Sequence, residues 1–326
     1  MSHELTQRAD GTVEFAYLKA DGLPWHGLGQ AMEDGASIDQ WRVAAGMDWR
    51  IQRGIVRYNV DREGTQLELP DQHVLFRSDD KAALGVVSKS YKVVQPGEVL
   101  EFFRDVARAG GLELSAAGTI QGGRRFWATA KIGEASPVSV RDRIGGYLLL
   151  STSADGSLAT EARLTSIRVV CKNTLQFARQ DAKPALKVSH RSVFDADAVK
   201  ASMGLNTAAW DAFRHNLTRL SNVDLHEEQA AEITAGLFAS GDSQEARDKA
   251  RETAGYRKVL ELFNGAGMGA TFDGVFGTAN GLLQAVTEYT DHHVRARSDE
   301  NRFVASQWGA GNALKQQAWD TLIALV

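Results

Sequence analysis

Period-two alternation and short apolar runs dominate the first half of the chain, whereas apolar residues recur at helical spacing in the second half. The early strand-like runs end at Pro96, where the apolar spacing predicts an amphipathic helix over 97–110. A shorter helix is expected over 37–47, with Ser37 as its N-cap. The strands predicted in this region are 49–59, 73–78, 84–88 and 91–95.

Two longer hairpins are predicted to follow the first helices. Gly122-Gly123 joins the strands of the first hairpin, because glycine accepts the positive φ that tight hairpin turns need. Asp155-Gly156 takes the same place in the second hairpin. We expect a long antiparallel meander with strands at 112–121, 124–132, 146–154 and 157–170.

Beyond about residue 195 the pattern predicts helices and no convincing strand. This order predicts an α+β fold: an antiparallel β-meander sheet with a packed helix in the N-terminal half, then a mostly helical C-terminal half. We expect a sheet-plus-helix domain over 1–180 as the candidate nucleic-acid-binding core and a helical region over 195–326. The predicted helices are 195–203, 206–221, 226–239, 243–264, 278–293 and 306–325.

Composition narrows the class of protein without changing this architecture. The 326 residues include 43% hydrophobic and 24% charged residues, as in a globular protein. A single cysteine, Cys171, excludes internal disulfides and a cysteine-rich zinc site. No apolar run approaches the roughly 20 residues that span a bilayer, and the first residues do not resemble a signal peptide. We therefore expect a cytoplasmic protein with no membrane partner.

The formal charge of −4 hides a regional excess of basic residues. Residues 141–191 contain nine Lys or Arg against four Asp or Glu, whereas the segments before and after are acidic. A locally basic strand pair in an acidic protein suits an anion-binding groove. The alternative to a binding groove is that this uneven charge distribution arises by chance, as it can in a long chain.

Alternation along the predicted strand 124–132 separates two kinds of face. Phe126, Ala128 and Ala130 belong to an apolar side, while Trp127 and Lys131 share the opposite side with a further arginine and a threonine. Cations beside an indole can follow a phosphate backbone and stack bases without sequence preference. A solvated sheet face is the alternative. The candidate contacts are Arg124, Arg125, Trp127, Lys131, Arg141, Arg143, Tyr147, Arg163, Arg168 and Lys172, with Trp127 and Tyr147 as stacking platforms.

Enzymatic alternatives find less support in the sequence. Neither a Walker-type phosphate loop nor a nucleophile elbow occurs, so we expect no cofactor and no catalytic residue. Asp291, His292 and His293 could belong to a metal-dependent phosphoesterase or nuclease. Adjacent helical residues point about 100° apart, so these three side chains need ligands from elsewhere to hold one ion.

Five motifs give the sequence a family resemblance. They are PWHGLG at 24–29, SYKVVQPGE at 90–98, RVVCKNTL at 168–175, NGLLQAVTEYTDH at 280–292 and WGAGNALKQQA at 308–318. The sequence resembles the phage/plasmid-like family of prokaryotic proteins, a domain family of unknown function found on phages and mobile plasmids.

A fold-level analogy then links this family to the single-strand annealing proteins of phages. The analogy implies a β-β-β-α core with a helix starting near Lys172, assembly into rings or filaments, and ATP-independent binding of single-stranded DNA. We therefore expect a non-catalytic homo-oligomer that binds and anneals single-stranded DNA in recombination or replication. A phage protein that binds a host protein remains a further alternative.

Overall fold

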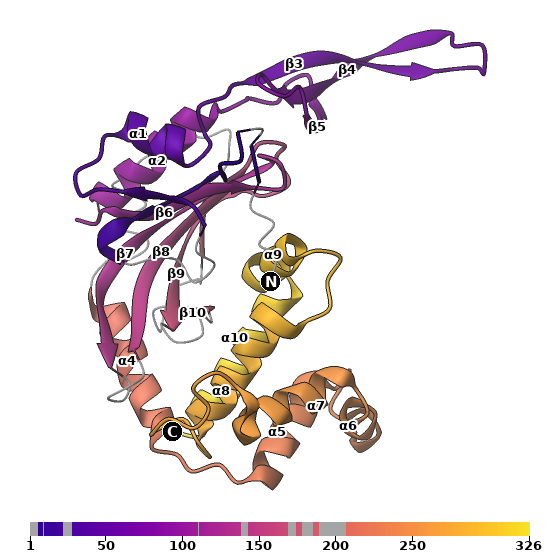
Figure 1. The fold of residues 1–326 in the computed structure, drawn as a ribbon. Helices are drawn as coiled ribbons and strands as arrows, with labels where there is room; N and C mark the ends of the chain where they lie inside the picture. Colours follow the sequence, from indigo (N-terminus) through magenta and orange to yellow (C-terminus); the bar gives the residue numbers. More distant parts are fainter. Residues whose placement is uncertain are drawn as a thin grey trace. The chain divides into compact units, whose positions relative to one another are not determined.

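The structure is a computed structural model and describes residues 6–8, 10–21, 28–109, 111–137, 143–168, 174–177, 185–188 and 207–326. It confirms the α+β class, with antiparallel sheets in the N-terminal half and helices in the C-terminal half (Figure 1). The chain forms two compact units. Unit 1 comprises Met1–Lys131, Leu148–Arg163 and Ala185–Leu205, and unit 2 comprises Ile132–Tyr147, Leu164–Pro184 and Asn206–Val326.

An eight-stranded sheet has the strand order β10-β9-β8-β7-β6-β1-β2, with β11 also paired to β9. The register places β1 antiparallel to β6 and parallel to β2. The sequence pattern did not predict β1 and β2, which are only four and three residues long. The strands are β1 (Phe15–Leu18), β2 (Gln30–Met32), β6 (Leu114–Ile120), β7 (Arg125–Pro137), β8 (Arg143–Ser153), β9 (Thr160–Arg168), β10 (Thr174–Phe177) and β11 (Ala185–Val188).

Two helices of unit 1 bury apolar residues close to this sheet. In α1 (Ile38–Ala44), the Ser37 hydroxyl accepts from the Gln40 amide and the Gln40 side chain accepts from the Ser37 amide, which confirms the expected cap. α2 (Pro96–Ala109) contacts β6 and buries Leu100 and Phe103 completely. The predicted amphipathic helix is therefore confirmed, and it begins one residue earlier than expected.

The turn between β6 and β7 needs both of its glycines. It runs from Gln121 to Arg124, and Gly122 and Gly123 have φ values of 65° and 86°. A Cβ at Gly123 would lie 2.5 Å from the Trp49 ring. Glycine is therefore required here both by the backbone conformation and by the closely packed indole.

A three-stranded sheet in unit 1 has the order β3-β4-β5. Its strands are β3 (Ile51–Asn59), β4 (Gln66–Arg77) and β5 (Ala83–Ser88), all antiparallel. The prediction for β4 was too short, because its outer half is exposed and contains Pro70.

The strand predicted at 91–95 is wrong, because these residues form no strand in the structure. Their side chains instead attach the segment to its neighbours. The Tyr91 hydroxyl donates to the Ala154 carbonyl at 3.2 Å, and the Gln95 amide side chain bonds both backbone groups of Ile51.

Tyr91 should make stability depend on pH in the alkaline range. Burial, with a smaller effect of Asp155, raises the pKa of Tyr91 to about 12. The unfolded state then loses this proton near pH 10, before the folded state does, so the free energy of unfolding falls as pH rises from 10 to 12. Urea unfolding across this range should show a flatter pH dependence for Tyr91→Phe; an unchanged dependence would contradict the assignment.

Unit 2 is largely helical, as expected. Two predicted helices are divided: 243–264 breaks where Thr253 caps a new helix, and 306–325 belongs to two helices that meet at Gly309. The prediction at 195–203 lies outside the described residues. The helices are α4 (Thr207–Ser221), α5 (Glu227–Phe238), α6 (Gln244–Arg251), α7 (Ala254–Glu261), α8 (Ala279–Glu288), α9 (Asp299–Trp308) and α10 (Ala310–Ile323), with π-helical turns η2 (Leu262–Ala266) and η3 (Tyr289–His293).

Aromatic residues of these helices fill the interior of unit 2. Trp210 and Phe213 are buried, and a Cβ at Gly146 of β8 would lie 2.7 Å from the Trp210 ring. The expected helix near Lys172 is corrected in part, because Thr174–Phe177 forms β10 against β9. Among the described helices, none has the length and apolar character required to cross a membrane.

Candidate nucleic-acid interface

Strand β7 has two chemically different faces, as its alternation predicts. Phe126, Ala128 and Ala130 are buried on one side. Arg125, Trp127 and Lys131 alternate with them and are half-buried. One strand therefore brings two of the predicted cations and the predicted indole to one side of the sheet.

The indole belongs to an aromatic row that crosses the sheet. Gly118 of β6 is the register partner of both Trp127 and Phe15, and it carries no side chain between them. The Phe15 and Trp127 rings therefore stack with centroids 5.6 Å apart, and Tyr17 lies 6.1 Å beyond Phe15. Phe15 is buried, with its ring against the backbone at Gly29, which leaves Trp127 and Tyr17 as the half-buried rings of the row.

Two predicted phosphate contacts already have carboxylate partners. Lys131 lies 3.2 Å from Asp21, and its side chain is 31% exposed. Arg163 lies 2.9 Å from Glu161, whose side chain is fully buried and also accepts from Ser151. A partly exposed pair is weak and exchanges readily, whereas removing the partner of a buried carboxylate is costly. Arg163 therefore has a structural task that Lys131 does not have.

Arg124 is exposed in the β6–β7 turn, and its guanidinium reaches the Ala83 carbonyl at 3.5 Å. A buried arginine holds this turn in place. Arg77 donates to the Gly122 carbonyl at 3.4 Å and lies over the Trp49 ring at 4.3 Å, the same ring that contacts Gly123. The contacts of Gly122 and Gly123 thus hold the turn that contains Arg124 in place.

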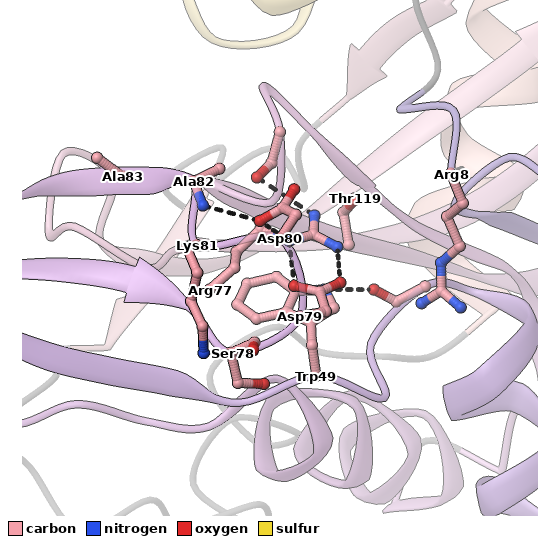
Figure 2. Close-up of polar contacts among 12 residues, drawn as sticks. Arg8, Trp49, Arg77, Ser78, Asp79, Asp80, Lys81, Ala82, Ala83 and Thr119 are labelled. Carbon is pink, nitrogen blue, oxygen red and sulfur yellow. Dashed lines mark hydrogen bonds and ion pairs between the residues drawn. The ribbon is translucent and has the colours of Figure 1, made fainter.

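Figure 2 shows the charged network around Arg77. Its guanidinium donates to Glu14 at 2.6 and 3.2 Å and to Asp79 at 2.7 and 3.0 Å. The Thr119 hydroxyl also donates to Glu14, and Arg8 lies 3.5 Å away from the same carboxylate. Glu14, just before β1, therefore joins β4 and β6 at one buried ion cluster.

The pKa values in this cluster follow from its contacts. Burial lowers the pKa of Arg77, but hydrogen bonds with Asp79 and Glu14 outweigh burial and raise it above its ordinary value. The hydrogen bond from Arg77 in turn lowers the pKa of Asp79. Both groups remain charged at neutral pH, so the cluster acts as a permanent structural clamp rather than as a proton donor.

The remaining candidates are only partly described. In unit 2, Tyr147 is half-buried, and its ring would lie 2.9 Å from a Cβ placed at Gly145. Arg143 and Arg168 belong to β8 and β9, but their side chains lie outside the described part of the chain. Arg141 and Lys172 lie wholly outside it.

The metal alternative meets a different arrangement at the end of α8. Asp291 lies 2.7 Å from the buried Lys315 ammonium, which supplies its counter-charge. His293 lies 3.6 Å from Glu288, and Glu288 accepts from the Met268 amide at 2.9 Å. Within the described residues, no group of three or more His, Cys, Asp or Glu is arranged to hold a metal ion.

Comparison with known protein families assigns this chain to one of them. A family model described as a domain of unknown function (DUF932) matches residues 83–308, more than half of the chain. The chain belongs to this family. The matched DUF932 segment begins with β5 and ends with α9, so it contains β7 and its candidate contacts. No curated protein and no solved structure matches the chain.

Sequence reasoning missed the contribution of β1 and β4 to this region. The short apolar run Phe15-Ala16-Tyr17-Leu18 is compatible with a strand, but four residues are too few to distinguish a strand from a loop by pattern alone. Arg77 lies near the end of the predicted strand 73–78, just before two aspartates and a lysine, and nothing in its neighbours indicates burial. Only the fold brings Glu14 to it from 63 residues away.

Proposed function

We propose that the protein binds and anneals single-stranded DNA of a phage or mobile element, in recombination or replication, in the host cytoplasm. The observation that carries the proposal is the row of Arg125, Trp127 and Lys131 on the side of β7 opposite the buried Phe126 and Ala128. Annealing needs neutralised phosphates and accessible bases, and it needs neither nucleotide hydrolysis nor a nucleophile.

The geometry supports a small cationic contact rather than a broad basic groove. Arg124 is exposed, and a phosphate can replace Asp21 beside Lys131 at little cost because that pair is partly exposed. Arg163 holds the buried Glu161 and therefore contributes less to phosphate binding than the sequence predicts. Weak contacts from one copy gain strength when copies are linked, and we include homo-oligomerisation in the proposal.

The first test is the double substitution Arg124→Ala/Arg125→Ala. We expect at least about tenfold weaker binding of a fluorescent oligonucleotide, because two phosphate contacts are lost. The magnitude of the slope of log affinity against log salt should fall by about 1.4, because each phosphate contact on a single strand contributes about 0.7 to that slope. Fluorescence anisotropy from 50 to 300 mM salt measures both quantities.

Arg62→Ala/Lys249→Ala is the matched control, since it removes the same charge from two exposed positions. Equal affinity and salt slope in both double variants would overturn the proposal. Absence of any polynucleotide binding at low salt would favour a host-protein binder instead. Cleavage of the oligonucleotide with Mg²⁺ or Mn²⁺ that is lost in His292→Ala would favour the phosphoesterase.

A further inference from the structure

The outer edge of β3 is open beyond Ile51, whose backbone groups bond the Gln95 side chain. Among the described residues, β3 pairs with β4 alone, and Figure 1 shows their outer halves as a ribbon that extends beyond the rest of unit 1. An open edge presents backbone donors and acceptors to any strand of matching shape. β3 has no proline and no lysine to block such pairing, and the extra residues of the bulge opposite Val56 belong to β4.

The hydrogen bonds at both ends of β3 show which backbone groups point outward. The Val60 amide donates across the ribbon to the Thr65 carbonyl, so this position faces β4. The Ile51 amide and carbonyl are instead occupied by the Gln95 side chain. Since direction alternates along a strand, the outward residues are Arg53, Ile55, Arg57 and Asn59.

The ribbon also carries an apolar face that the rest of unit 1 leaves exposed. Tyr58 and its cross-strand partner Leu67 are 48% and 49% exposed, and Val60 is 49% exposed. The opposite face has the cross-strand ion pair of Arg57 with Glu68 at 2.9 Å. Residues 51–72 hold three arginines against four acidic residues, a balance that suits a protein partner better than a polyanion.

Charge and strand length together favour one symmetric way to pair two copies of β3. An axis at Gly54 would need the Ile51 backbone, which Gln95 occupies, and an axis at Tyr58 would pair only three residues of the strand. A two-fold axis at Ile55 would place Arg53 opposite the partner's Arg57, and an axis at Arg57 would oppose two identical arginines. An axis at Val56 avoids both conflicts and pairs Arg57 with the partner's Ile55. It also places Tyr58 opposite the partner's Gly54, which has no side chain to obstruct the ring.

We propose that β3 pairs antiparallel with β3 of a second copy about a two-fold axis at Val56, which joins two three-stranded sheets into one of six strands. Seven paired residues on each copy, Arg53 to Asn59, give a contact about 23 Å long. This inference deepens the self-association included in the proposed function by naming its surface. It is tested without DNA, so its failure and the failure of DNA binding are distinguishable.

Cysteine cross-linking of the full chain tests the register. In a Cys171→Ser background, Val56→Cys would face its own copy in a pair without backbone hydrogen bonds, where the Cα atoms are about 4.5 Å apart and a disulfide fits. Ile55→Cys is the matched control. In the proposed register, Ile55 of one copy and Ile55 of the other are offset by two residues along the strands, so the two cysteines would not face each other. We expect a covalent dimer from Val56→Cys at least about tenfold faster than from Ile55→Cys under mild oxidation.

Sedimentation equilibrium of two further variants tests the same register without cross-linking. Ile55 is 56% exposed, so substitutions there leave the fold intact. Ile55→Lys places a cation opposite the partner's Arg57 and should weaken self-association at least about fivefold, whereas Ile55→Glu should preserve or strengthen it. Monomers at all concentrations, equal effects of Lys and Glu, or faster cross-linking of Ile55→Cys would overturn the proposal.

Discussion

Replacing Arg77 with methionine is expected to lower the free energy of unfolding by about 3–5 kcal/mol, the usual cost of breaking a buried ion pair from one side. The substitution leaves Glu14 buried, with Thr119 and the more distant Arg8 as its remaining side-chain partners among the described residues. It also removes the cation above Trp49 and the bond to the Gly122 carbonyl. Denaturant unfolding followed by circular dichroism measures the loss.

Arg57→Met is the matched control for this prediction. Arg57 also pairs with a glutamate across two strands, but both side chains are more than half exposed, and such pairs contribute under about 1 kcal/mol. The double variant Arg77→Met/Glu14→Leu should recover part of the stability, because it also removes the buried carboxylate that Arg77→Met leaves without its cation. Similar losses in Arg57→Met and Arg77→Met would show that the buried cluster has no special importance.

Lys315→Met should destabilise the protein by a similar amount, about 3–5 kcal/mol. Lys315 is among the largest fully buried side chains, and its ammonium bonds Asp291 at 2.7 Å. Burial lowers the pKa of Lys315 and Asp291 opposes this shift, so the carboxylate and the ammonium depend on each other for charge compensation. Thermal unfolding and denaturant titration should both report the loss.

Two variants separate the charge of Lys315 from its volume. Lys315→Met/Asp291→Leu should be more stable than Lys315→Met alone, since methionine keeps the packing and leucine removes the unpaired carboxylate. Lys249→Met, in an exposed pair with Glu245, should change stability by less than about 1 kcal/mol. A double variant no more stable than the single variant would indicate that packing, and not charge, explains the effect.

The sequence was most informative where one local signal decides the structure. Ser37 predicted the start of α1, Gly122-Gly123 predicted the turn after β6, and apolar spacing predicted α2. The sequence-based prediction failed where contacts between distant segments determine the local structure. Residues 91–95 have strand-like composition, but Gln95 and Tyr91 bond to other segments instead of joining a sheet. Local preference cannot reveal such contacts.

In the candidate site, too, the sequence predicted the local features and missed the tertiary contacts. Alternation along β7 correctly separated buried Phe126 from the face of Trp127, because strand geometry alone determines it. The partners of the cations could not be found, since Asp21 is 110 residues from Lys131 along the chain. The sequence therefore could not show that Lys131 and Arg163 already have carboxylate partners.

The two buried ion clusters also bear on how fragments of this protein should be chosen. The segment that defines DUF932, residues 83–308, excludes Glu14, Arg77 and Lys315 but includes Thr119 and Asp291. An excised 83–308 fragment would lose the first cluster's central arginine and leave Asp291 without its ammonium. The smallest piece suitable for expression is therefore longer at both ends than the piece by which the family is recognised.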